Sequence, residues 1–203
     1  MGETRLCDQC GKEFELRREH ARFCSSDCRI GWVREHSGDP GAPGEALSWS
    51  ITAMTEATTR LVHAATQDLH RFAAAVSEAV WWVTIVDATM VRYEREAYDW
   101  VLERLPAEVA ERVDETLAGL RYVRNQVGIN LDPAEFVRPA EDGTWIWSPL
   151  SEPCLESLSP RGQGWEMGRY LAYRSRLVGH DVAGTFAFAS SFLTRIAAQA
   201  PAA

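Results

Sequence analysis

Four cysteines in two close pairs are the feature that most constrains the N-terminal part of this chain. Cys7 and Cys10 form the first pair, and thirteen residues separate it from the second pair, Cys24 and Cys28. Thiolates at this spacing can close a tetrahedral shell around one metal ion, as structural Zn²⁺ sites require. The sequence therefore predicts that these four cysteines bind a structural zinc ion.

Disulfide bonds or free thiols are the alternative explanation of these cysteines. The N-terminus is polar, and no apolar stretch typical of an export signal follows it. Without export the thiols stay reduced, so we expect a cytoplasmic protein whose paired cysteines bind metal. Cys154 lies far away, next to Pro153, and we expect it to be a free thiol without a role.

The residues around the cysteines predict a small treble-clef fold. Gly11 can close a turn after the first pair, and we expect a short two-stranded segment around Phe14 and Phe23. A helical pattern starts at the second pair, with Ser25 or Ser26 as its N-cap. The turn, the strands and a helix carrying the last ligand together make up a treble clef.

The motif itself resembles a known family of zinc fingers. Cys-x-x-Cys-Gly-Lys-x-Phe, from Cys7, is followed by Arg-Phe-Cys-Ser-x-x-Cys-Arg, from Arg22. This resembles the small treble-clef fingers of the FCS type and covers the chain up to about residue 35. Such fingers bind nucleic acid in some proteins and dock protein partners in others. The resemblance implies a metal site and leaves RNA and protein as alternative partners.

The distribution of charge restricts the choice of nucleic acid. The net charge is −8, yet residues 1–36 carry seven basic and seven acidic side chains. Phosphate binding normally needs a surplus of basic groups, so general DNA binding is disfavoured. A local basic patch of Arg17, Arg18 and Arg22 remains the predicted contact with nucleic acid.

The rest of the chain has the pattern of a helical bundle. Residues 37–46 are rich in Gly and Pro and predict a linker between the finger, residues 1–36, and a second domain, residues 47–203. The fold class we expect is mainly α: a four-cysteine treble-clef zinc finger, then a bundle of about five helices with an inserted β-hairpin. The expected helices cover 48–65, 68–104 with a kink allowed, 106–128, 162–177 and the segment that Asp181 caps.

Apolar residues recur at three- and four-residue steps in these helices. In the first helix the stripe contains Ile51, Met54, Leu61 and Val62. In the second it contains Leu69, Phe72, Val76, Val80, Val83, Val86 or Asp87, Met90 and Tyr93. The longest apolar run, Ala79 to Val86, is far shorter than the ~20 residues of a membrane span, so we expect no membrane segment.

A hairpin is predicted near residues 134–148, because Asp142-Gly143 favours a tight turn between two short strand patterns. Trp145 and Trp147 alternate along its second strand, and Trp165 follows nearby. They can stack bases, dock a protein or pack the hairpin on the bundle. Two tryptophans on one face need burial, so we expect packing.

The end of the third helix resembles the HEPN superfamily. Arg124 and Asn125 lie near the end of a long helix in a predicted bundle. Many HEPN proteins are metal-independent ribonucleases of toxin–antitoxin and phage-defence systems, with Arg, a polar residue and, four to six residues later, His. Arginine holds the scissile phosphate while histidine moves a proton. Two subunits usually combine, so the resemblance implies a homodimer.

The histidine of that motif is missing here. Asn130 stands in its place, and asparagine cannot act as a general base near neutral pH. Arg174 and His180 match the spacing elsewhere, and Asp181 could orient the imidazole. The alternative for His180 is a turn residue beside a helix cap. A ribonuclease, if the chain is an enzyme, would use Arg124, Asn125, Asn130 and His180.

Two classes of function follow from the sequence. The first is a zinc-containing, RNA-directed binding protein of bacterial defence or toxin–antitoxin systems, with a HEPN-type ribonuclease as the alternative. The second is a non-catalytic adaptor or regulator whose finger docks a protein partner. The missing histidine at position 130 and the acidic balance favour binding over catalysis.

Overall fold

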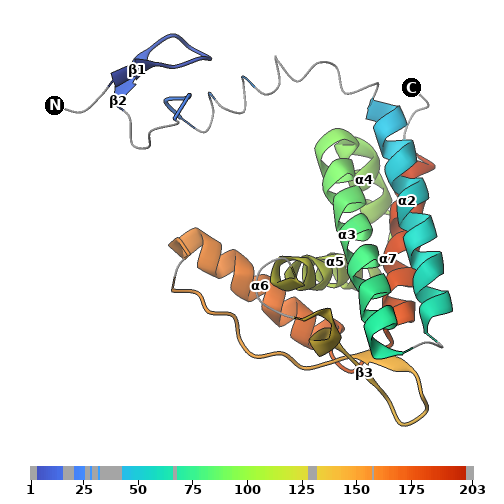
Figure 1. Cartoon of the computed structure of the whole chain (residues 1–203). Helices are drawn as coiled ribbons and strands as arrows, with labels where there is room; N and C mark the ends of the chain where they lie inside the picture. The colour runs from blue at the N-terminus through green and yellow to red at the C-terminus, as the bar shows by residue number, and fades with distance from the viewer. Residues whose placement is uncertain are drawn as a thin grey trace. The chain divides into compact units, whose positions relative to one another are not determined.

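The computed structural model describes residues 4–15, 21–25, 28, 32, 43–65, 68–127, 132–156 and 158–199. The chain divides into two compact units, Met1–Pro43 and Gly44–Ala203. The described part is mainly helical, with six α-helices and two short hairpins (Figure 1). The predicted fold class, mainly α with a small cysteine-containing unit and an inserted hairpin, is confirmed.

The described residues of the first unit form a two-stranded antiparallel sheet. Strand β1, Thr4–Leu6, pairs with β2, Glu13–Glu15, so that Arg5 lies opposite Phe14. Gly11 has a φ of +68° in the connecting turn, as its freedom from a Cβ predicts. The expected pairing of Phe14 with the Phe23 segment is wrong among the described residues, because this turn folds β2 back onto β1 instead.

Only the start of the predicted finger helix can be followed. The Ser25 hydroxyl accepts a hydrogen bond from the Cys28 backbone N–H at 3.1 Å, the geometry of an N-cap side chain three residues before its donor. This supports Ser25 as the cap. Ser26 and most residues after Cys28 lie outside the described residues.

The second unit is a bundle in which α3 has the central position. Figure 1 shows α2, α3 and α7 side by side, with α5 crossing α3 partway along its length and α6 packed against α5. The helices are α2 (Pro43–Ala64), α3 (Leu69–Tyr93), α4 (Arg95–Glu103), α5 (Ala107–Val127), α6 (Pro160–Arg176) and α7 (Val182–Ala197). One continuous cluster of buried apolar side chains, between Leu47 and Ile196, forms its core.

Most of the predicted apolar stripe of α3 is buried. Its buried members include Phe72, Val76, Val80, Val83 and Met90. Two predicted core positions are wrong: Tyr93 is 49% exposed, at the end of the helix, and Val62 of α2 is 59% exposed. Helix α2 also begins at Pro43, before the predicted start at residue 48.

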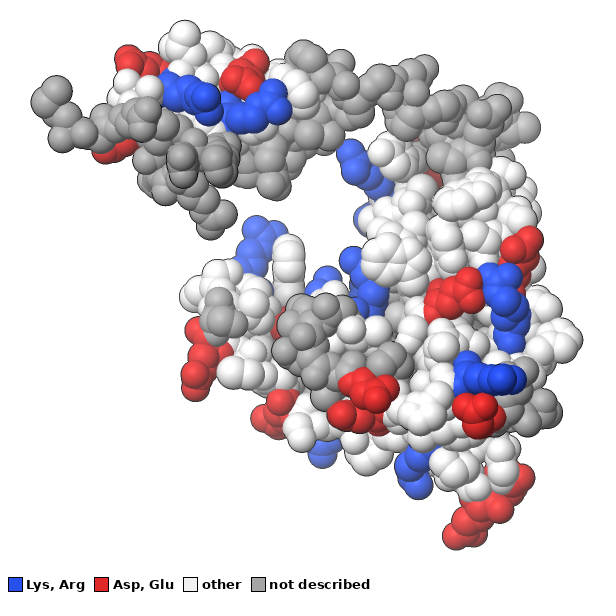
Figure 2. Space-filling model, viewed as in Figure 1, with Lys and Arg blue, Asp and Glu red and all other residues white. Residues whose placement is uncertain are grey.

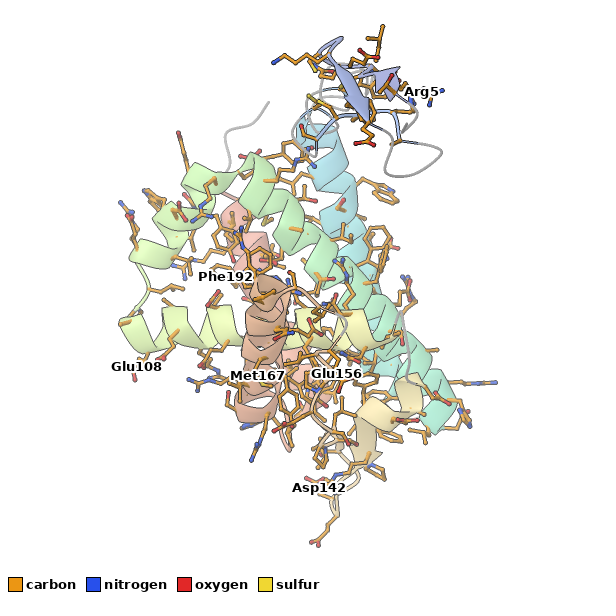
Figure 3. All side chains as sticks on the ribbon, turned by 90° about the vertical axis from the view of Figure 1, so that its left-hand side faces the viewer. Arg5, Glu108, Asp142, Glu156, Met167 and Phe192 are labelled. Atoms are coloured by element: carbon orange, nitrogen blue, oxygen red, sulfur yellow. The ribbon has the colours of Figure 1, made fainter. Side chains whose placement is uncertain are left out.

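The predicted helix over 68–104 is divided by a sharp break. Asp68 is the N-cap of α3, and its carboxylate accepts hydrogen bonds from the backbone N–H groups of His70 and Arg71. Glu94 leaves the helical conformation, with φ −121° and ψ 36°, and α4 starts at the next residue. This break turns α4 back toward α7, where Tyr98 meets Phe192 edge to face with ring centroids 5.5 Å apart (Figure 3).

Helix α3 contradicts the expectation that no segment has the length of a membrane span. Among the described helices, it alone is long and apolar enough to cross a bilayer, by length and composition. The same composition suits the core helix of a bundle, and α3 buries ten of its residues against its neighbours. The expectation that no segment reaches spanning length is therefore wrong as a statement about length, and the burial of α3 explains its apolar character.

The predicted hairpin is present and packs on the bundle. After the 3₁₀ turn η1, Pro133–Phe136, strand β3, Val137–Pro139, pairs with β4, Trp145–Trp147. Gly143 has a φ of +83° at the tip, and Asp142 marks this tip in Figure 3.

Packing is also the observed role of the two hairpin tryptophans. Trp147 is buried between Tyr173 and Phe186, with ring centroids 6.3 and 5.8 Å away. Trp145 stacks on Phe72 at 4.7 Å and donates its indole N–H to the Ala65 carbonyl. The expectation that these rings hold the hairpin on the bundle is confirmed.

Helices α5 and α6 approach each other very closely at Gly119. A Cβ at this position would lie 2.9 Å from Leu177 Cδ1 and 3.1 Å from the Tyr173 Cα. The absence of a side chain therefore sets the distance at which the two helices cross.

Candidate metal centre and the arginine sites

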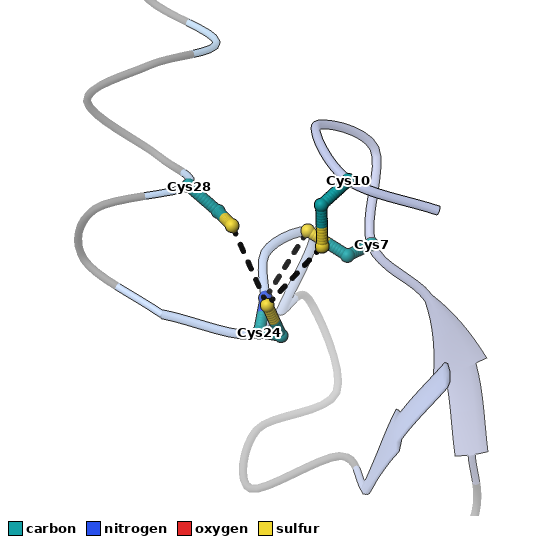
Figure 4. A group of neighbouring side chains, drawn as sticks. All are labelled: Cys7, Cys10, Cys24 and Cys28. Carbon is teal, nitrogen blue, oxygen red and sulfur yellow. Dashed lines mark hydrogen bonds between the residues drawn. The ribbon is translucent and has the colours of Figure 1, made fainter. Parts of the chain in front are cut away.

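Four cysteine side chains converge in the first unit. The sulfur atoms of Cys7, Cys10, Cys24 and Cys28 all lie within 4.8 Å of one another (Figure 4). The Sγ atom of Cys24 lies 3.6 Å from that of Cys10 and 3.5 Å from that of Cys28. All five cysteines of the chain are free thiols, so the predicted alternative of disulfides is not what the structure contains.

Backbone hydrogen bonds bring the two cysteine pairs together. The N–H of Cys7 donates to Lys12 O, and the N–H of Gly11 donates to Cys7 O, both at 2.9 Å. These bonds close the turn that carries the first pair. The Asp8 N–H donates to Arg22 O at 3.0 Å, which holds the segment before Cys24 against that turn.

The donor set fits one tetrahedral ion. Zinc–sulfur bonds of about 2.3 Å at tetrahedral angles place neighbouring sulfurs about 3.8 Å apart, close to the 3.5 and 3.6 Å separations at Cys24. Four thiolates with no carboxylate or imidazole among them are the ligands of a closed structural site. The cluster can therefore hold a metal ion, and its chemistry is of the zinc type.

The thiols of this cluster have strongly divergent acidities. Burial disfavours the Cys7 thiolate, but hydrogen bonds from the backbone N–H groups of Cys24, Cys10 and Gln9 outweigh it and lower its pKa to about 6. Hydrogen bonds that the Cys24 thiol makes with Cys28, Cys10 and Cys7 raise its pKa to about 12. Four adjacent sulfurs cannot all carry a negative charge without a cation to balance them.

Arg22 is the only member of the predicted basic patch within the described residues; Arg17 and Arg18 lie outside them. Its guanidinium donates to the Asp8 carboxylate at 2.6 Å. It also lies over the rings of Trp32 and Phe23, at 4.7 and 5.5 Å from their centroids. An arginine and two aromatic rings thus lie next to the cysteine cluster.

Arg124 and Asn125 lie in the last turn of α5, as predicted, and both contact other helices. The Arg124 guanidinium lies 5.6 Å from the Trp81 ring centroid and 3.5 Å from the Thr84 hydroxyl. The Asn125 amide donates to the Glu166 carboxylate at 3.2 Å. Asn130 lies outside the described residues.

His180 is far from Arg124. Its exposed side chain lines a cavity of about 460 Å³ together with Arg112 and Thr116 of α5. Thr116 precedes Arg124 by eight residues, about 12 Å along the helix axis. The structure therefore does not bring Arg124 and His180 of one chain together.

Asp181 acts as a helix cap. Its carboxylate accepts from the backbone N–H groups of Ala183 and Gly184, at 3.2 and 2.6 Å. The proposed orienting role of Asp181 toward His180 is therefore not observed, because the cap uses both carboxylate oxygens.

One polar cluster in the core was not predicted from the sequence. Asp87 of α3 is fully buried, at 0% exposure, and is bonded by Arg121 of α5 and by the hydroxyl of Tyr98 of α4. Burial raises the pKa of Asp87, and Arg121 partly opposes the rise. Burial and the Asp87 charge raise the pKa of Tyr98. The sequence did contain one signal of this cluster, because Asp87 stands at a position of the apolar stripe that is expected to face the core.

Comparisons of the chain with protein-family models, with curated proteins and with solved structures found no match. The resemblances to FCS-type fingers and to HEPN proteins therefore rest on the quoted residues alone.

Proposed function

We propose that the chain is a zinc-binding protein that associates with RNA and does not cleave it. The zinc part rests on one observation, the convergence of four thiols within 4.8 Å. The RNA part is supported by the arginine that lies over two aromatic rings beside this cluster, since guanidinium groups bind phosphate and rings stack on bases. The setting, a bacterial defence or toxin–antitoxin system, rests on the HEPN resemblance.

Binding without catalysis is favoured by the surroundings of Arg124. Its neighbour Asn125 is hydrogen-bonded to Glu166. His180 lies near Arg112 and Thr116, in an earlier part of α5 than Arg124. Proton transfer at a scissile phosphate needs a base within hydrogen-bond reach of the reacting oxygen. Within the described residues of one chain, no histidine lies beside Arg124.

Metal analysis of the full chain tests the zinc part. We expect one zinc ion per chain in protein purified without chelator, and its loss in Cys24→Ser. The matched control is Cys154→Ser, which removes an exposed thiol outside the cluster and should keep the zinc. Well under one zinc per wild-type chain would refute the site.

RNA binding is tested by the anisotropy of a labelled single-stranded RNA, with Arg22→Ala as the variant. We expect weaker binding in the variant, because it removes the guanidinium over Trp32. A cleavage time course with wild type and Arg124→Ala runs beside it. Cleavage that disappears in Arg124→Ala would establish the ribonuclease alternative, and no RNA binding by the wild type would favour the protein adaptor.

A further inference from the structure

The bundle contains a second surface that combines arginines with an exposed tryptophan, Trp165, and we call it the α5–α6 groove. It has a volume of about 1120 Å³ and is lined mainly by α5 and α6, together with Val91 of α3. Figure 2 shows basic side chains gathered on the side of the bundle between α6 and α3. The net charge of the chain is −8, so this gathering is a local departure from the overall balance.

The carboxylates of this region are already engaged. Glu115 pairs with Arg176. Glu166 accepts hydrogen bonds from Asn125 and Gln126 and lies 3.6 Å from Arg169. Their charges are therefore balanced within the fold, and the exposed Asp114 is the one groove carboxylate for which the described residues provide no ion pair.

Three arginines remain available to an outside anion. Arg174 lines the groove, Arg161 lies one turn before its first lining residue on α6, and Arg124 follows Arg121 by one turn on α5. Among the described residues, no carboxylate pairs with any of the three. Their three positive charges exceed the single negative charge of Asp114. The resulting positive surplus makes this surface suited to a polyanion.

Two of these arginines lie on exposed tryptophans. Trp165 is 59% exposed, and the Arg161 guanidinium lies 4.6 Å from its centroid. Trp81 of α3 lies outside the lining of the groove; it is 53% exposed, and the Arg124 guanidinium lies 5.6 Å from its centroid. Indole rings left in water beside guanidinium groups can stack bases while the cations hold phosphates.

The side of the groove that α6 forms has two positions without a side chain. Gly164 and Gly168 lie one turn apart and line it, and a Cβ at either position would meet no heavy atom within 4 Å. Packing inside the bundle therefore does not require these glycines, although each costs helix stability relative to alanine. Their smallness leaves room for a ligand backbone to lie against the helix.

We propose that the α5–α6 groove binds single-stranded RNA, with Trp165 and Trp81 stacking bases and Arg124, Arg161 and Arg174 holding phosphates. This inference rests on the proposed function and adds a second RNA contact to that of the finger. A single strand fits better than a duplex, because paired bases offer no open faces to the two tryptophans.

The test is the anisotropy of a labelled 12-nucleotide oligo(U) titrated with zinc-loaded full-length protein, wild type and variants. Trp165→Ala should weaken binding about 30-fold, the middle of the range for one stacked base. Arg161→Ala/Arg174→Ala should lower the slope of log K against log salt by about 1.4, since each phosphate contact on a single strand contributes about 0.7. Gly168→Leu, which fills the groove without changing charge, should also weaken binding.

The matched control is Arg138→Ala/Arg195→Ala, which removes two exposed charges outside the groove and should lower the salt slope little. Urea unfolding of every variant checks that the fold is kept. Oligo(U) binding that all groove variants share with wild type would overturn the groove site while the proposed function stands. Absence of RNA binding by the wild type would overturn both.

Two further outcomes would also overturn the groove proposal. Equal affinity for the single strand and a duplex of the same length would exclude base stacking as its basis. A dimer that light scattering detects in the wild type and that Trp165→Ala dissociates, with RNA affinity unchanged, would assign the groove to a second copy of the chain.

Discussion

Replacing Arg121 by methionine should destabilise the bundle strongly, because it leaves a buried carboxylate without its cation. Asp87 is 0% exposed, and Arg121 donates to it from Nε at 2.9 Å and from a terminal nitrogen. In Arg121→Met only the Tyr98 hydroxyl, 3.1 Å away, still donates. Removing one partner of a buried ion pair costs about 3–5 kcal/mol, a large share of the roughly 5–15 kcal/mol that stabilises a domain.

The size of this loss should depend on pH. Burial raises the pKa of Asp87 and Arg121 lowers it, so the variant carboxyl has a still higher pKa in the folded state. Between the ordinary pKa of 3.8 and that raised value, the folded protein binds a proton that the unfolded chain has released. The free energy of unfolding of the variant therefore falls as pH rises through this window. We expect a larger loss at pH 8 than at pH 5.

Urea unfolding followed by circular dichroism at the two pH values measures both effects. The matched control is Asp87→Asn/Arg121→Met, in which the buried group can no longer ionise. Its free energy of unfolding should therefore fall less between pH 5 and pH 8 than that of Arg121→Met. A loss below about 1 kcal/mol for Arg121→Met at both values, the level of an exposed pair, would refute the reasoning. So would a loss that is equal at the two pH values.

Three further predictions concern the helices and the metal. Gly119→Ala should lower the free energy of unfolding in urea by about 1–3 kcal/mol, because its Cβ would press on the Tyr173 backbone. Gly164→Ala, with open space around it, should raise the free energy of unfolding by about 0.5–1 kcal/mol. Equal effects of the two substitutions would contradict this account of the helix crossing. Asp181→Ala should lose about 1 kcal/mol through its cap, while His180→Ala, whose side chain is exposed, should change little. A chelator should remove the metal but leave the far-UV circular dichroism signal of the helices nearly unchanged, since the core cluster of the bundle contains only residues between Leu47 and Ile196. A large loss of helical signal would contradict this prediction.

The sequence predicted those features whose cause is local. Cysteine spacing predicted which thiols converge, and the Asp142-Gly143 pair predicted the hairpin tip. The apolar period of α3 predicted most of its buried face. In each case a short stretch of chain determines the outcome, through ligand spacing, turn conformation or the repeat of the helix.

The features that were missed depend on residues far apart in the chain. Asp87 lies 34 residues from Arg121, and the pair forms only because α3 and α5 cross where they do. The break at Glu94 has no proline or glycine to mark it. The separation of Arg124 from His180 likewise follows from how α6 and α7 are placed around α5, which no local pattern encodes.

The segment between α6 and α7 behaves as an irregular third strand of the hairpin. Trp147 N–H donates to His180 O at 3.1 Å, and Gly179 N–H donates to Trp147 O at 2.9 Å. This loop therefore has little tolerance for inserted sequence, although it is short and partly exposed. The hairpin tip around Asp142 has no such attachment to a helix among the described residues. For anyone who wishes to label or tether the protein, the tip is the position at which to open the chain.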